Sequence, residues 1–394
     1  MDIADAGIPE PVLGVLEALH FDRPSTARLC ALTSAEWDEL LDWCDRRQIT
    51  FVLHAACGDA LPLRVQKRIG ASLERYSLRF ARLQDELASV IDILDGRGIS
   101  FVVLKGVTHA PEMTPDPLLR AQGDIDLWIP DGAALIAQDA LIDAGYRPVG
   151  SGHSDRHLRP LARPGTWRWR GDIFDPDMPV RVELHHDLWR SESERIPVPG
   201  EHGFRTRLEQ RDFGGRRAFV LCPHDMVGFA ALHVLLHLLH GDVPLQRAWE
   251  IGRFLHLRAD DALFWSAWRK THGPELRSAQ ALVFDIVRRW FGCRVPACAA
   301  NEVVGLNEPV RRWLDRFAFS PLRQQSRPNR DQLWLHLALV PSMAGRARVL
   351  LRNFFPVHAG RRRILSASRL RHYAATLAPT LLHGLGLRLS RSND

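Results

Sequence analysis

Apolar positions recur at helical spacing through the first hundred residues of the chain. Between Leu83 and Leu94, apolar side chains return at every third or fourth position, which is the repeat of one helix face. Gly96 and Gly98 then interrupt the pattern, as glycines do just past the end of a helix. The pattern therefore predicts an N-terminal helical region over residues 1–95.

After residue 98 the pattern changes to that of short strands. The run ISFVVL is nearly all apolar and rich in β-branched residues, which predicts a central strand covered on both faces. The run TWRWRGDIF alternates between apolar and polar residues, which predicts a strand open to solvent on one face. With a helix expected at residues 131–146, this order of elements indicates a small mixed domain over residues 96–220. The expected strands are residues 99–104, 125–129, 166–174 and 179–189.

From Pro223 onward the helical repeat returns. It predicts a helical domain over residues 221–345, followed by an arginine-rich segment over residues 346–394. The expected fold class is therefore α+β, with a small mixed-sheet core flanked by N-terminal and C-terminal helical regions. The clearest expected helices are residues 223–241, 245–259 and 273–292, with shorter ones at 309–319 and 330–339.

The net charge of +6 conceals an uneven distribution of charge. Residues 346–394 hold ten arginines, no lysine and one acidic residue, a balance of +9, so the rest of the chain carries −3. A basic segment of this kind can meet nucleic acid, anionic lipid or an acidic partner. A solvated, arginine-rich helix is the plainer interpretation, so an anionic partner for the C-terminal segment is one of two hypotheses.

The remaining composition is that of an ordinary globular protein. No run of about 18 uncharged apolar residues marks a membrane-spanning helix, and the acidic N-terminus does not resemble a signal peptide. None of the six cysteines forms a CxxC pair, so we expect reduced thiols. Together these features predict a cytoplasmic protein without a transmembrane segment.

Two aspartates lie in the second expected strand, one residue apart. Residues i and i+2 of a strand point to the same face, so Asp124 and Asp126 project together. Neighbouring carboxylates repel unless a cation joins them, and Mg²⁺ or Mn²⁺ takes such oxygen ligands. Glu183 lies on a later expected strand between two apolar residues and would join the pair if the strands are adjacent. An Asp-x-Asp pair also occurs by chance in turns and at strand edges.

Basic residues that could bind phosphate lie close to these acids in the sequence. Lys105 and Gly106 follow the first strand, where glycine allows backbone amides to approach a phosphate and lysine adds a charge. Arg120 can make a bidentate phosphate contact. Alone, a Lys-Gly pair is more often a simple turn. Three carboxylates, two divalent ions and these basic groups would together form a phosphoryl- or nucleotidyl-transfer site.

The ordered motifs FVVLKG, Arg120, GDIDLWI and VELHHDL resemble a bacterial nucleotidyltransferase family of the DNA polymerase β-like superfamily. The resemblance covers residues 75–260 and extends to the histidine-rich run ALHVLLHLLHG and to RAWEIGRFL, which holds Glu250. It implies a nucleotidyltransferase core with helical additions and a divalent metal ion.

The same resemblance assigns roles to individual residues. It implies Asp124, Asp126 and Glu183 as a metal-binding and catalytic triad. It places Lys105 and Gly106 where the superfamily has a Gly-Ser phosphate turn. Here the residue after Gly106 is valine, so a serine contact to phosphate is absent.

Histidines form a second group of candidate residues. His233, His237 and His240 share one helical face, which suits zinc, but the glutamate of an H-E-x-x-H site is missing. A structural or substrate-facing role is therefore favoured. His185 shares the face of Glu183 and is expected either to orient that carboxylate or to contact a substrate phosphate.

Two tryptophans in the run TWRWRGDIF offer aromatic surface. Trp167 and Trp169 alternate with arginines, which would suit stacking on a nucleobase. Packing of the strand against helices is the plainer interpretation.

The sequence thus favours an enzyme that moves a nucleoside monophosphate from an NTP to a hydroxyl, phosphate or amine acceptor and releases pyrophosphate. Glu183 would take the acceptor's proton. One alternative is a non-catalytic nucleotide- or partner-binding module on the same fold. Another is a nucleic-acid-modifying enzyme that uses its arginine-rich segment. No motif indicates whether the acceptor is a small molecule, a peptide or a nucleic acid.

Overall fold

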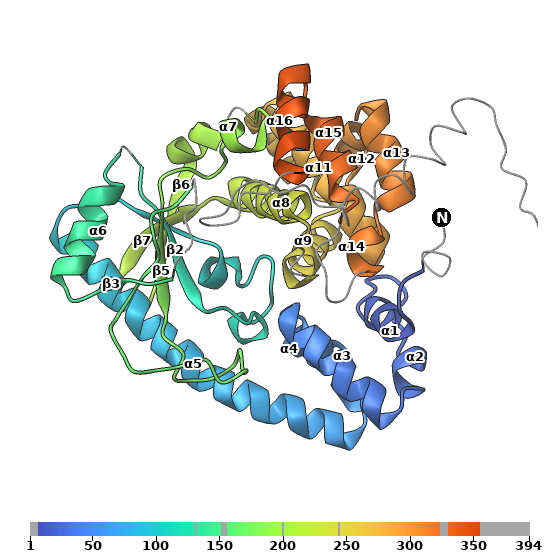
Figure 1. Ribbon diagram of the computed structural model, residues 1–394, viewed down its shortest axis with the longest axis horizontal. Helices are drawn as coiled ribbons and strands as arrows, with labels where there is room; N and C mark the ends of the chain where they lie inside the picture. Colours follow the sequence, from blue (N-terminus) through green and yellow to red (C-terminus); the bar gives the residue numbers. More distant parts are fainter. Residues whose placement is uncertain are drawn as a thin grey trace, which may run out of the picture.

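The computed structural model confirms the α+β fold class, with helices on both sides of a mixed sheet (Figure 1). It describes residues 7–130, 132–150, 156–198, 201–242, 245–323 and 330–354. The arginine-rich segment predicted at 346–394 lies outside the described residues from position 355 on.

In the described part of the chain, five α-helices precede the sheet. Helix α3 begins with a capping box, in which the Thr33 hydroxyl accepts from the backbone N–H of Glu36 and the Glu36 carboxylate accepts from that of Thr33. Helix α5 is the longest and runs from the other N-terminal helices to the sheet (Figure 1). The bounds are α1 Glu10–Ala18, α2 Ala27–Cys30, α3 Ser34–Arg46, α4 Thr50–Cys57 and α5 Leu63–Gly96.

Seven strands form one sheet in the order β3-β4-β5-β2-β1-β7-β6. Strands β2 and β5 are parallel neighbours, as are β1 and β7, while β1 and β2 are antiparallel. The strands are β1 Val102–Leu104, β2 Asp124–Trp128, β3 Arg147–Pro148, β4 Leu161–Ala162, β5 Arg181–His185, β6 Leu208–Asp212 and β7 Arg217–Leu221. Short helices between them are η3 Gly106–His109, η4 Pro117–Leu119, α6 Ala134–Asp143, α7 Ser191–Glu194 and η5 Glu201–Arg207, with η2 Gly58–Ala60 before α5.

The two faces of the sheet differ in chemistry. One face is apolar, with Ile125 and Leu127 of β2 and Val182 and Leu184 of β5 packed in one buried cluster with side chains of α5 and α6. Because successive side chains of a strand alternate, the polar residues between them point to the opposite face. The sheet is thus anchored on α5 and α6 and presents its carboxylates toward the other side.

Helices α8 and α9 lie on that other side, between the sheet and the C-terminal helices (Figure 1). Helix α8 is buried over most of its length, which explains its nearly continuous apolar sequence. The helices are α8 Pro223–His240, α9 Leu245–Leu257, α10 Ala262–Thr271, α11 Pro274–Phe291, α12 Ala297–Val304, α13 Glu308–Phe317, α14 Ser320–Arg323, α15 Gln332–Leu339 and α16 Met343–Phe354.

The strand predicted at residues 166–174 is wrong. The segment is a loop in which Asp172 and Asp175 each accept a hydrogen bond from the backbone N–H two residues on. Asp175 also accepts from the indole N–H of Trp167 at 2.9 Å. Local turn chemistry therefore outweighs the alternating pattern.

The hairpin of β6 and β7 was not predicted from the sequence. Its turn contains Gly214 and Gly215, both with positive φ, and the Gly-Gly pair followed by RAFVL was the available signal. Strand β7 pairs with β1 and thereby extends the sheet beyond the expected strands.

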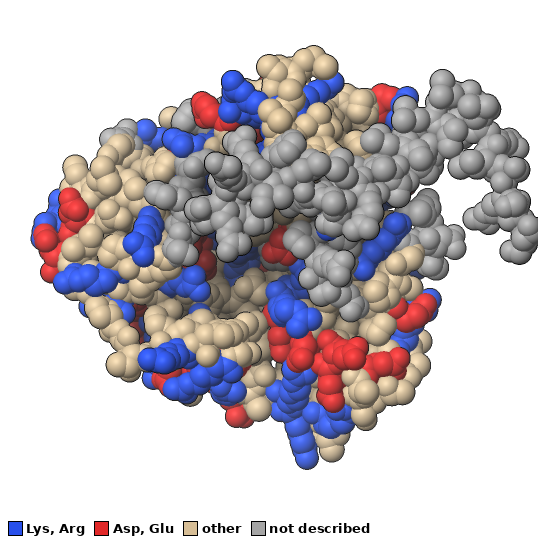
Figure 2. Space-filling view, viewed as in Figure 1, with Lys and Arg blue, Asp and Glu red and all other residues tan. Residues whose placement is uncertain are grey.

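Within the described ranges, no helix is both long enough and apolar enough to cross a membrane. All six cysteines are free thiols, as expected. The space-filling view is hollowed near the centre of one face, and acidic and basic side chains are interspersed over its described surface (Figure 2).

Candidate active site

The pairing of β2 with β5 brings the predicted acids together. The two strands run parallel with Asp126 opposite Glu183 and Asp124 opposite Arg181. Residues opposite each other on one face of a sheet lie close enough for direct interaction. The condition set by the sequence, that the two acidic strands be adjacent, is met.

Asp126 is the most heavily bonded of these acids. Its side chain is only 6% exposed, and its Oδ1 accepts from Lys105 Nζ at 2.7 Å and meets His185 Nε2 at 2.8 Å. Burial alone would raise the pKa of Asp126, but the Lys105 ammonium and the His185 hydrogen bond outweigh burial and lower it. Asp126 is therefore an ionised carboxylate in a buried setting.

The negative charge of Glu183 is less well offset by neighbouring groups than that of Asp126. Burial and the charges of Asp126 and Asp124 raise the pKa of Glu183 to about 7. Its Oε2 lies 3.7 Å from His185 Nε2 and 3.8 Å from His157 Nε2. Burial lowers the pKa of His185 to about 4, so its ring is neutral at pH 7 and its Nε2–H donates to Asp126.

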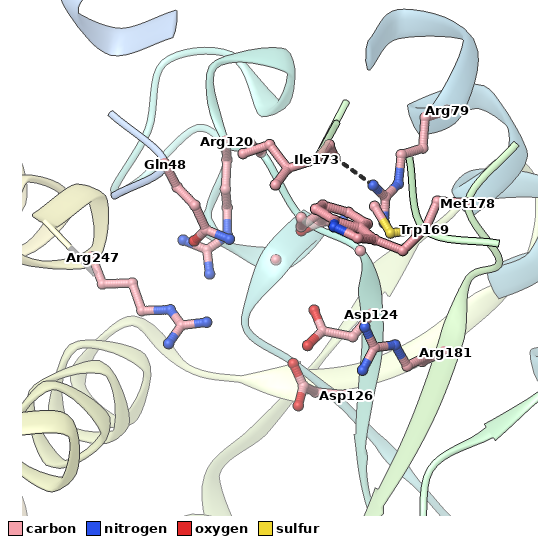
Figure 3. A pocket seen from close by; sticks show the side chains of 14 residues that line it. Gln48, Arg79, Arg120, Asp124, Asp126, Trp169, Ile173, Met178, Arg181 and Arg247 are labelled. Atoms are coloured by element: carbon pink, nitrogen blue, oxygen red, sulfur yellow. Dashed lines mark hydrogen bonds between the residues drawn. The ribbon is translucent and has the colours of Figure 1, made fainter. Parts of the chain in front are cut away.

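Asp126, Glu183 and His185 fit a metal ion. Each offers one ligand atom, and the three atoms lie within 4.8 Å of one another. To ligate through Nε2, the His185 ring would carry its proton on Nδ1 and give up its hydrogen bond to Asp126. Two carboxylates and one imidazole suit several divalent ions. Asp124 points into the same space but is not a member of this three-atom cluster (Figure 3). His185 thus lies among the candidate ligands, beside the acid pair that the sequence singled out.

Lys105 and Gly106 form the turn that follows β1. Both have a φ of 48°, which is a left-handed conformation that favours glycine. A Cβ on Gly106 would lie 2.2 Å from Gln122 Oε1, at the end of a flexible side chain, so a larger residue here would have to displace that amide. The turn lies beside Asp126 because Lys105 bonds to that carboxylate.

Arg120, predicted to contact phosphate, is engaged with protein groups. Its guanidinium donates to Glu250 of α9, which is fully buried and also bonds to His109 Nδ1 at 2.9 Å. Burial would raise the pKa of Glu250, but Arg120 and His109 outweigh burial and lower it to about 2. Arg120 still lines the same cavity as the aspartates, with its charge offset by Glu250.

A cavity of about 300 Å³ lies over these groups. In Figure 3, Asp124, Asp126, Arg120 and Arg247 point toward a shared space, and Trp169 lies across it. The lining holds four arginines and two aspartates, which makes it net positive even before a metal ion binds. The arginines are Arg79, Arg120, Arg181 and Arg247.

Some residues of this site were missed from the sequence. His157 lies in the polar loop before β4. Its backbone pairs with that of His185 on β5, and this pairing brings the His157 ring close to Glu183. Arg247 enters the cavity from α9, which is separated from β2 by more than a hundred residues. No spacing rule links such distant positions, although Arg247 lies three residues before Glu250 in the run RAWEIGRFL.

The three histidines of α8 divide between two environments. His233 and His237 contact each other and Arg247, whereas His240 bonds to Glu194 at 3.2 Å. Among the described residues, the cluster suited to a metal ion contains none of the three. The three histidines that share one helical face therefore do not share one set of partners.

A family model described as uncharacterised nucleotidyltransferase matches residues 33–292. The chain belongs to this family. The match extends from the start of α3 through the whole sheet to the end of α11, so the acids, the Lys-Gly turn and α8–α9 all lie inside it. The expectation of a nucleotidyltransferase family is confirmed.

Among solved structures, the chain is similar to an antigenic nucleotidyltransferase-like protein from Paracoccidioides brasiliensis. The two chains share 16% identity with a TM-score of 0.33, over 55% of this chain and 95% of the other. No curated protein matched the chain.

Proposed function

We propose that this protein is a metal-dependent nucleotidyltransferase. It would transfer a nucleoside monophosphate from an NTP to an acceptor and release pyrophosphate. The observation that carries the proposal is the register of β2 and β5, which sets Glu183 opposite Asp126 beside the Lys105-Gly106 turn. Family membership supports the same reaction class.

The donor set fits a divalent cation. Asp126, Glu183 and His185 would hold one ion, and Asp124, which points into the same space, would share a second with substrate oxygens. We propose Mg²⁺ or Mn²⁺, since carboxylate oxygens dominate the site. The bound ions would supply charge neutralisation for the phosphates.

The protein's own groups account for the remaining steps. The acceptor oxygen or nitrogen attacks the α-phosphorus, the bond from that phosphorus to the bridging oxygen breaks, and pyrophosphate leaves. A carboxylate accepts the acceptor's proton, a role that Glu183 suits because it is less strongly paired than Asp126. A phosphate bound beside the Lys105-Gly106 turn would meet backbone N–H groups at the start of η3 and would share the Lys105 ammonium with Asp126.

Isothermal titration with each of the four NTPs, with and without Mg²⁺, tests this proposal. We expect Mg²⁺-dependent binding of at least one NTP by the wild type. The Asp124→Asn/Asp126→Asn double variant should lose at least about 10-fold in that affinity, because the metal ligands are removed. Asp92→Asn is the matched control, since Asp92 lies on the exposed surface of α5 and bonds to Arg216.

Unchanged Mg²⁺-dependent binding in a folded double variant would contradict the metal assignment. NTP binding without pyrophosphate release, across hydroxyl, phosphate and amine acceptors, would favour the second candidate, a non-catalytic nucleotide-binding module. The Lys105–Asp126 ion pair is the observation that favours this second candidate, because it already occupies one oxygen of the central acid.

A further inference from the structure

Arg247 is a cation in the cavity that no carboxylate offsets by direct contact. Its guanidinium points toward the space in front of Asp124 and Asp126 (Figure 3). Across the part of the chain that the structure describes, no carboxylate lies within ion-pair distance of it. The two other candidate phosphate ligands differ, because Lys105 is paired with Asp126 and Arg120 with Glu250.

Two histidines fix the orientation of this guanidinium. Arg247 Nη1 lies 2.6 Å from His233 Nε2 and 2.8 Å from His237 Nε2. Arginine has donors only, so both Nε2 atoms accept and each ring carries its proton on Nδ1. Both imidazoles are therefore neutral, and they hold the cation without offsetting its charge.

The opposite edge of the guanidinium lacks a partner. Arg247 Nε is buried and has no hydrogen-bond partner among the residues that the structure covers, as is also true of Nε of Arg79 and Arg120, and Arg247 Nη2 meets no acceptor there either. Arg247 differs from Arg120 in that no carboxylate already engages its guanidinium. The Nε–Nη2 edge is the one with which arginine binds a phosphate through two parallel hydrogen bonds. An unsatisfied buried donor is costly, so this edge is prepared for an anionic ligand.

The cavity favours a ligand with several negative charges. Its lining is net positive, and a divalent ion on the acids would increase this excess. Arg247 enters from α9 and faces the two aspartates (Figure 3), and Gly106 of the Lys105-Gly106 turn lines the same cavity. A chain of phosphates lying between the turn and α9 would offset these charges together.

We propose that Arg247 is the phosphate-binding arginine of this cavity, with His233 and His237 as its positioning residues, and that its ligand is the polyphosphate chain of the donor nucleotide. This inference rests on the proposed function for the identity of the donor. It moves the phosphate contact from Arg120, which Glu250 already engages, to a residue on α9.

Isothermal titration with inorganic tripolyphosphate and with the NTP that binds best tests the site. Arg247→Gln should weaken binding of both probes by about 10- to 100-fold, the range expected for a charged hydrogen-bond pair. Arg253→Gln should stay within about twofold of the wild type, because Arg253 lies on the same helix but donates to the backbone oxygens of Pro111 and Glu112. Circular dichroism verifies that each variant is folded.

The histidines are tested by rescue. His237→Leu removes the acceptor and should weaken tripolyphosphate binding by about 5- to 10-fold. His237→Gln places an amide oxygen near the former Nε2 and should restore most of the affinity. Equal losses in both variants would mean that His237 only fills space, which would overturn its positioning role.

The outcomes separate this inference from the proposed function. If Arg247→Gln is folded and binds tripolyphosphate as the wild type does, the inference fails while NTP binding can still stand. If the wild type binds tripolyphosphate through Arg247 but transfers no nucleotide, the proposed function fails and the phosphate site stands. If the wild type binds neither tripolyphosphate nor any NTP, the cavity is not a phosphate-binding site.

Discussion

At the scale of single residues, this site depends on backbone geometry as much as on charge. Lys105 and Gly106 adopt the same positive φ, and the Gly106 Cα lies against the Gln122 amide. A left-handed lysine is strained, and such strain concentrates at functional sites. The turn is therefore held by its surroundings, with the Lys105–Asp126 ion pair as one restraint.

Gly106→Ala should weaken nucleotide binding directly, in addition to lowering the stability of the fold. An alanine Cβ there would displace the Gln122 amide, which lines the cavity, in addition to about 1–2 kcal/mol of backbone strain. We expect at least about 10-fold weaker NTP binding by titration calorimetry.

Gly98→Ala is the matched control for this change. Gly98 also has positive φ, at 65°, but an added Cβ would meet no atom within 4 Å. It should lose similar stability in thermal unfolding and keep its affinity. Equal affinities in the two variants would show that the Lys105-Gly106 turn does not touch the nucleotide.

At the scale of elements, α8 and α9 act as a unit with the sheet. Helix α8 supplies His233 and His237, and α9 supplies Arg247 toward the cavity and Glu250 toward Arg120. The Glu250–Arg120 pair is buried, so removing one partner would leave an uncompensated charge. These contacts fix α9 relative to the loop that precedes β2.

The two α8 histidines predict a pH dependence of stability. Burial, reinforced by the Lys105 and Arg247 charges, lowers the pKa of His233 well below its usual value, and burial with Arg247 lowers that of His237 to about 2. In the unfolded chain both bind a proton as the pH falls through about 6.5, whereas in the folded chain they do not. Stability present above about pH 6.5 is therefore lost as the pH falls, by up to about 1.4 kcal/mol per pH unit for each histidine.

Urea unfolding of the wild type and of a His233→Gln/His237→Gln variant at pH 7.5, 6 and 5 checks this prediction. The variant keeps two acceptors for Arg247 but cannot titrate, so its stability should fall less steeply between pH 6 and 5. The difference between proteins at pH 7.5 measures packing alone. Parallel slopes in the two proteins would mean that these histidines are not held neutral.

At the scale of the whole molecule, α5 joins the N-terminal helices to the sheet. Its first half, with Val65 and Tyr76, belongs to the buried cluster of the helical regions. Its second half, with Leu83, Leu87 and Val90, belongs to the cluster under the sheet. The predicted boundary between residues 95 and 96 assigns α5 to the N-terminal helical region, although the second half of this helix packs under the sheet.

Removal of residues 1–95 should abolish cooperative folding of the remainder. The apolar face of the sheet would lose α5, and each buried leucine of that helix contributes about 2 kcal/mol. We expect an aggregated protein or one without a thermal transition by circular dichroism, whereas the full chain should unfold in a cooperative transition. A cooperative transition in the shorter protein would contradict this account.

The sequence alone determined the features that depend on local periodicity. Alternation along one strand sets Asp124 and Asp126 on one face, a 3.6-residue repeat defines α5 and α11, and the Lys105-Gly106 turn follows an apolar strand. Such patterns need no knowledge of what lies across the fold.

Only the tertiary structure decided which elements meet. The β2–β5 register places Glu183 opposite Asp126, the burial of Glu250 draws Arg120 away from solvent, and α8 orients Arg247 through two histidines. These partners lie tens to more than a hundred residues apart, so their contacts follow from packing of apolar faces, which no local repeat encodes. The acids of the site could therefore be found in the sequence, whereas the arginine that faces them could not.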